Sequence, residues 1–144
     1  MRSAAALALA AAVALPACRP VRYEPALATR PYPQELGQGE TIQVQVLNEG
    51  DVMVVINATP RRFENVDLWL NQRYMCHVDR IAPGETLRLS FDLFWDVRGE
   101  GPNPGGALRY FQPTPIRLAQ IQVDPKTPLI GLVAVPMERE LAAK

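Results

Sequence analysis

Apolar and polar residues alternate with a period of two along most of the chain from residue 40 onward. Ile42, Val44 and Val46, for example, are separated by single polar residues. Successive side chains of a strand point to opposite faces, so this pattern predicts strands with one buried face. We expect seven strands, at residues 41–46, 52–58, 66–70, 73–78, 87–91, 117–123 and 129–135.

Turn-forming residues separate these segments. Asn48-Glu49-Gly50-Asp51, Ala82-Pro83-Gly84-Glu85 and residues 124–128 have the composition of turns, and Asn71-Gln72 is suited to the tip of a hairpin. No apolar stripe of helical period extends over ten residues in this region. The pattern predicts an all-β domain over residues 40–136, an immunoglobulin-like antiparallel sandwich of about seven strands, followed by a short tail at 137–144.

The first 18 residues have a different character. Arg2 precedes an uncharged apolar run at residues 4–15, which is too short to span a bilayer and is typical of a secretory signal. Leu15-Pro16-Ala17-Cys18 resembles the lipobox of bacterial lipoproteins. That resemblance implies removal of residues 1–17 and lipidation of Cys18. If the host has an outer membrane, Arg19 is similar to the sorting pattern for that membrane, with the protein facing the periplasm. The alternative is an ordinary cleaved signal with Cys18 as a chance neighbour.

Residues 18–39 are rich in proline. Pro20, Pro25, Pro31 and Pro33 favour extended polyproline conformations, so we expect a linker that spaces the domain from the lipidated residue.

Several short motifs inside the domain carry a family resemblance. Asn57-x-Thr59, Phe63-x-Asn65-Val66 and Pro83-Gly84-Glu85-Thr86 resemble FxLYD-type and related bacterial immunoglobulin-like domains. The run from Leu68 to Tyr74 is similar to one in small uncharacterised bacterial lipoproteins. The resemblance implies a fold and a location in the cell envelope, and it implies no set of catalytic residues.

Charge and cysteine usage narrow the range of partners. Lys plus Arg and Asp plus Glu both number 15, so no excess charge favours nucleic acid or another polyanion. If Cys18 is acylated, Cys76 has no partner within the chain and is expected to be buried.

No residue cluster supports a reaction, a metal ion or a cofactor. Cys76 and His77 are neighbours on a predicted strand and point to opposite faces, so they cannot bind one ion, while His77 and Asp79 share a face and can form a weak pair. Asp92, Asp96 and Glu100 lack the spacing of a calcium loop and are interpreted as solvated carboxylates or as a cap on a short helical turn near 92–98. We therefore expect a protein that is not an enzyme.

Aromatic residues form the remaining candidate site. Trp69 falls on the polar side of its strand, and Phe94, Trp95, Tyr110 and Phe111 flank the long connection 92–115. If these rings are exposed, they could bind a glycan or a peptide. If they are buried, they would instead close an open end of the sandwich.

These observations favour a non-catalytic, membrane-anchored envelope lipoprotein. Its β domain would serve an interaction or structural role, for example by strand addition at a sheet edge to an envelope protein. The alternative is a glycan- or peptide-binding module that uses the loop aromatics.

Overall fold

The computed structural model describes residues 22–105 and 112–136. All seven predicted strands are present, and three short 3-10 turns accompany them. The elements are η1 (Pro25–Leu27), η2 (Gln34–Leu36), β1 (Gln38–Asn48), β2 (Val52–Asn57), β3 (Phe63–Leu70), β4 (Tyr74–Ile81), β5 (Thr86–Ser90), η3 (Phe91–Leu93), β6 (Ala119–Gln122) and β7 (Leu129–Val135).

The strands form one mixed sheet in the order β4-β3-β6-β7-β1-β2-β5. The all-β prediction is confirmed, but the sheet is not wholly antiparallel, because β1 runs parallel to β7. β1 has 11 residues and pairs on both sides. Its second half pairs antiparallel with β2, and its contact with β7 extends from Gln38 to Leu47 across two register shifts.

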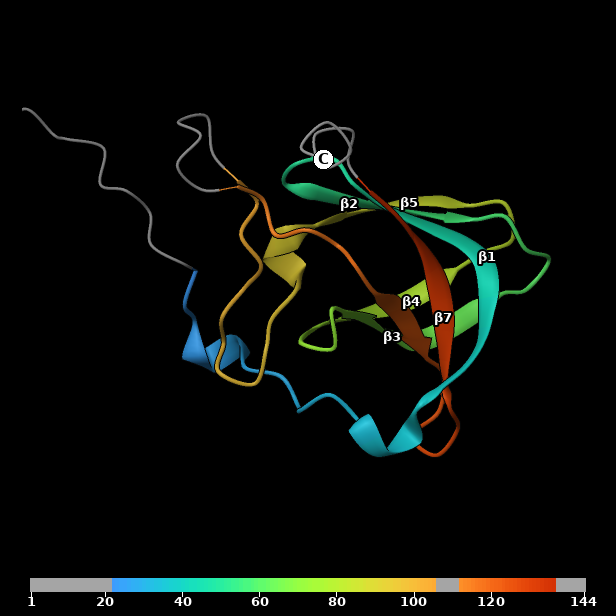
Figure 1. Cartoon of the computed structure of the whole chain (residues 1–144), viewed down its shortest axis with the longest axis horizontal. Coiled ribbons are helices and arrows are strands. Elements are labelled where there is room, and N and C mark those ends of the chain that lie inside the picture. Colours follow the sequence, from blue (N-terminus) through green and yellow to red (C-terminus); the bar gives the residue numbers. More distant parts are fainter. Residues whose placement is uncertain (1–21, 106–111, 137–144) are drawn as a thin grey trace, which may run out of the picture.

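The sheet curls around a single core and is nearly barrel-shaped. Figure 1 shows β2 and β5 on one side of the core and β3 and β4 on the other, with β1 and β7 closing the side between them. The inward side chains of every strand meet in this space. Val44, Val55, Val66 and Ile121 are completely buried there, as burial of one face of each strand requires.

The hairpin between β3 and β4 has the predicted tip. Asn71 and Gln72 have positive φ angles of 52° and 56°. Two consecutive residues in this region define the tight turn whose twist matches that of paired strands.

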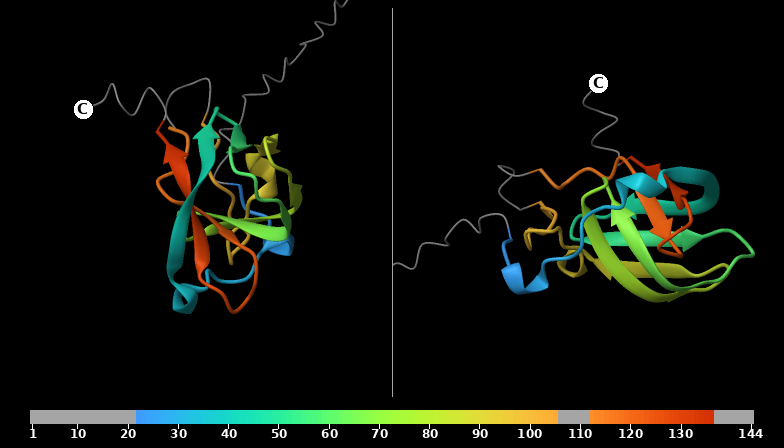
Figure 2. Two further views of the ribbon diagram at one scale, coloured as in Figure 1. Left: turned by 90° about the vertical axis from the view of Figure 1, so that its right-hand side faces the viewer. Right: turned by 90° about the horizontal axis from the view of Figure 1, so that it is seen from below.

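The proline-rich segment is not a free spacer in its described part. Residues 22–37 pack along the domain, with Glu24 donating a backbone hydrogen bond to Gly99 (2.7 Å) and Tyr32 donating to the Gln120 side chain (2.9 Å). Figure 2 shows the blue η1 beside the gold segment that follows η3. Composition sets chain stiffness but does not reveal these side-chain contacts of residues 22–37 with the sheet.

Candidate functional site

Trp69 is covered by the N-terminal segment. Its side chain lies on the outer face of β3, yet it is completely buried. The Tyr32 ring packs edge-on against it at 5.4 Å, the Arg30 guanidinium lies 5.1 Å from its centroid, and its Nε1 donates to Gln122 (3.1 Å). These contacts occupy the indole completely, so it offers no face to a ligand.

Phe94 and Trp95 are also buried. Phe94 packs in the core, with its ring centroid 6.3 Å from that of Phe91. Trp95 is 7% exposed, and the Arg22 guanidinium lies over its ring, 4.6 Å from the ring centroid. Of the two interpretations of these aromatics, the exposed one does not hold for Trp69, Phe94 and Trp95: the N-terminal segment covers Trp69, Phe94 packs in the core, and Trp95 lies beneath Arg22. Tyr110 and Phe111 lie outside the described residues, as does Cys18.

Cys76 and His77 point to opposite sides of β4, as predicted. Cys76 is a buried free thiol in the core, and the side chain of His77 is 53% exposed. His77 contacts Asp67 on β3 through Nδ1 (2.8 Å), with Asp79 more distant at 3.8 Å. In the part of the chain that the structure describes, no three His, Cys, Asp or Glu side chains converge as a metal site would require.

The environment of Cys76 predicts a pH effect on stability. Burial, assisted by the negative charge of Asp67, raises the pKa of the Cys76 thiol from 9.0 to about 11. The unfolded chain therefore ionises this thiol first, so its contribution to stability is complete below pH 9 and is lost as the pH rises toward 11. Two pKa units correspond to at most about 3 kcal/mol.

Urea unfolding at pH 8 and pH 10.5 measures this effect. The chain is expected to lose more stability over this interval than its Cys76→Ala variant. Equal losses in the two proteins would show that the buried thiol does not ionise on unfolding.

The three acidic residues after β5 have separate roles. Asp92 pairs with Arg22 (2.6 Å), and Glu100 pairs with Arg73. Asp96 is buried rather than solvated, and Arg73 contacts its Oδ2 at 2.8 Å. The helical turn is η3, and its N-terminus is capped by the Ser90 hydroxyl rather than by an aspartate.

Two of the surface hollows in the described part of the chain are candidate sites. The smaller, about 380 Å³, is lined by Asn71, Gln72, Pro115, Arg117 and Leu118. The Asn71 side chain fills a structural role there, since it donates to the Pro115 carbonyl (2.7 Å) and accepts from the amides of Arg117 and Leu118.

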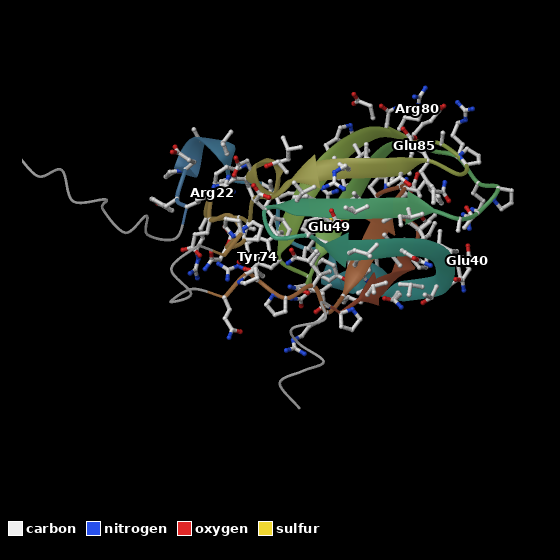
Figure 3. The ribbon with its side chains drawn as sticks, turned by 90° about the horizontal axis from the view of Figure 1, so that it is seen from above. Arg22, Glu40, Glu49, Tyr74, Arg80 and Glu85 are labelled. Carbon is white, nitrogen blue, oxygen red and sulfur yellow. The ribbon has the colours of Figure 1, made fainter. Side chains whose placement is uncertain are left out.

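The larger hollow, about 480 Å³, lies between the two ends of the sheet. It is an open groove, which we call the seam, and it is lined by His77, Val78, Asp79 and Arg80 of β4, with Glu85, Leu87 and Leu89 of β5 and its preceding turn. β4 and β5 are the first and last strands of the sheet, so curling brings its two edges together without pairing them. Figure 3 shows Arg80 and Glu85 close together, far from Arg22 at the other end of the molecule.

One residue already occupies part of the β4 edge. Trp95 exchanges two backbone hydrogen bonds with Met75, at 2.9 and 3.1 Å. In an antiparallel ladder every second residue directs its main-chain groups to the same side, so His77 and Asp79 present theirs to the seam. Within the described residues, no strand pairs with β4 beyond Met75 on this side.

The sequence did not reveal the seam residues as a set. Alternation identifies strands and their buried faces, but it does not say which strands end a sheet. The charged residues Asp79, Arg80 and Arg88 were the available signal, because charge is typical of edge strands.

In the described part of the chain, no helix is long and apolar enough to cross a membrane. Comparison with family models, with curated proteins and with solved structures gives no significant match to this chain.

Proposed function

We propose that this protein is a lipid-anchored, non-catalytic binding protein of the bacterial envelope that takes up an extended segment of another envelope protein at the seam. The observation that carries the proposal is the meeting of two unpaired sheet edges around a groove. Strand addition uses the main chain of such an edge for affinity and nearby pockets for specificity.

The β4 edge supplies the main-chain partner in this proposal. The pairing with Trp95 stops at Met75. The next main-chain N–H and C=O groups of β4 that point outward belong to His77 and Asp79. An incoming strand would continue the line that Trp95 begins, and its alternate side chains would rest on Val78, which lines the groove. The single-residue bridge supports this geometry, because it forms on the same edge.

The walls of the groove suit a segment with both apolar and polar residues. Leu87 and Leu89 supply apolar surface, while Asp79, Arg80 and Glu85 supply charges of both signs. Mixed charge at an edge also opposes pairing between two copies of the same sheet, so it favours a dedicated partner.

The anchor rests on the sequence of the N-terminus. The apolar run at 4–15 and the Leu-x-Ala-Cys ending at Cys18 support export and lipidation, with palmitate among the attached chains. Arg19 supports an outer-membrane location facing the periplasm where the host has that membrane.

We also infer that the fold is a variant of the immunoglobulin-like sandwich. The order β1-β2-β5 corresponds to strands A, B and E of one layer, and β4-β3-β6-β7 corresponds to C′, C, F and G of the other. In this variant β1 belongs to both layers, so two sheets become one curled sheet. This correspondence in connectivity supports the inference, with a parallel pair in place of a wholly antiparallel arrangement.

Crosslinking in the native envelope tests the function. A photoreactive residue at Arg80 is expected to give a defined adduct with one envelope protein, whereas the same residue at exposed Lys126 on the β6–β7 turn is not. His77→Pro removes an outward N–H and is compatible with the fold of an edge strand, so the Arg80 adduct should fall about tenfold.

His77→Ala is the matched control, because it removes the same imidazole and keeps the N–H. The adduct should persist in His77→Ala and disappear in Cys18→Ser, which should also lose incorporation of a palmitate analogue. Equal adducts from Arg80 and Lys126, or equal loss in both His77 variants, would contradict strand addition. Persistent lipid label in Cys18→Ser would contradict the anchor.

A further inference from the structure

Four exposed apolar side chains come from two neighbouring segments of the chain. Among the described residues, five large apolar side chains are about half exposed or more, and four of them are Tyr23, Leu27, Leu93 and Val97. We call these four residues the apolar end. Isolated exposed apolar residues are ordinary, but a group at one place marks an interaction surface.

Direct contacts hold the two segments together. Tyr23 forms a backbone bridge with Glu100, and Arg22 accepts a hydrogen bond from the Gly101 amide (3.0 Å) through its carbonyl. The Arg22 guanidinium also pairs with Asp92, next to Leu93. Figures 1 and 2 both show η1 beside the segment that follows η3, at the end of the molecule opposite β1 and β7.

The packing between these segments leaves no spare room. A Cβ atom on Gly99 would lie 2.2 Å from the Glu24 carbonyl oxygen, and Gly99 has a positive φ angle of 77°. The segment that carries Tyr23 and Leu27 is therefore fixed against the turn that carries Val97.

The chain length places a lipidated Cys18 close to this end. Only four residue steps separate Cys18 from Arg22, whose carbonyl is bound to Gly101. Fully extended, four residues span at most about 14 Å. A lipid on Cys18 would thus hold the apolar end at the bilayer surface.

We propose that the apolar end docks on the lipid bilayer to which Cys18 is anchored, with its four side chains in the headgroup region. This inference rests on the proposed lipid anchor. Acidic residues outnumber basic ones in the two segments. The acidic residues are Glu24, Asp92, Asp96 and Glu100, and the basic ones are Arg22 and Arg98, so apolar insertion rather than attraction to anionic lipid holds the surface.

Docking fixes the direction of the seam. Arg80 and Glu85 lie at the opposite end of the molecule from Arg22 (Figure 3), so the open part of the groove is directed away from the membrane. The short tether raises the effective concentration of the apolar end at the bilayer, so a weak surface suffices.

Fluorescence of the lipidated full-length chain in phosphatidylcholine vesicles tests the docking. A single cysteine replaces Leu27 in a Cys76→Ala background and carries an environment-sensitive fluorophore. The matched control replaces Val123, an equally exposed apolar residue on the β6–β7 turn. The probe at 27 should shift to the blue and lose most of its emission to nitroxide-bearing lipids, and the probe at 123 should do neither.

Flotation of the same samples separates the tether from the docking. Vesicles that carry the protein while both probes remain water-exposed would overturn the docking and leave the anchor intact. A chain that does not float with the vesicles would overturn the anchor and the docking together.

Discussion

Replacing Asn57 by alanine is expected to lower the free energy of unfolding by about 3 kcal/mol. The Asn57 side chain is completely buried at the end of β2 and makes four hydrogen bonds. Its Nδ2 donates to the carbonyls of Arg61 (2.8 Å) and Ala82 (3.0 Å), and its Oδ1 accepts from the Thr59 amide and hydroxyl. One amide thus joins the β2–β3 loop to the β4–β5 turn, and alanine leaves buried polar groups without partners.

Urea unfolding measures this loss. Asn103→Ala is the matched control, because its Oδ1 accepts from the Gly105 amide within a partly exposed loop. The control should change stability by less than about 1 kcal/mol. A loss at Asn57 no larger than that at Asn103 would refute the structural role of this amide.

Replacing Asp96 by alanine should be comparably costly, again about 3 kcal/mol, because it removes a buried carboxylate and leaves the hydrogen-bond donors around it without an acceptor. The carboxylate is 3% exposed. It accepts hydrogen bonds from the amides of Arg98 (2.8 Å) and Glu100 (2.9 Å) and from the Arg73 side chain (2.9 Å). Its main-chain carbonyl also accepts from the Thr29 amide, so the same residue holds the N-terminal segment on the domain.

The effect of Asp96 depends on pH with a definite sign. Burial alone raises the pKa of Asp96, but the amides of Glu100 and Arg98 and the charge of Arg73 outweigh it and hold the pKa below 3.8. The stabilisation is therefore complete well above pH 3.8 and is lost as the pH falls below that value.

Denaturation of the chain and of Asp96→Ala at neutral and acidic pH checks both statements. The difference in free energy of unfolding between the chain and Asp96→Ala should become smaller as the pH falls below 3.8. Asp124→Ala is the control, because the exposed Asp124 accepts from the Lys126 amide in a surface turn and should change stability little. A constant difference at all pH values would show that the charge of Asp96 is irrelevant.

The strands were predictable because burial of one face of a strand requires apolar and polar residues to alternate along the sequence. Ile42, Val44 and Val46 alternate with polar residues, and they are the buried apolar residues of β1. This alternation does not indicate which strands pair with β1. Val44 and Val46 would be buried against either β2 or β7, so the sequence does not reveal the parallel pair or the curl that it produces.

The packing of the N-terminal segment over Trp69 shows a second limit of prediction from the sequence. An indole on the polar side of a strand needs a partner when it is not a binding site, and Arg30 and Tyr32 supply it from a segment more than 30 residues earlier. Prolines in that segment indicated an extended chain, which it partly is. They carried no information about what the extended chain lies against.

Amide hydrogen exchange at the seam tests the central claim most directly. In the isolated protein His77 and Asp79 should exchange rapidly, whereas Cys76 and Val78 should be protected by pairing with β3. In the native envelope the first two amides should become protected and that of Lys126 should not change. Unaltered exchange of His77 and Asp79 in the envelope, or strong protection of both in the isolated protein, would contradict a seam that receives a partner strand.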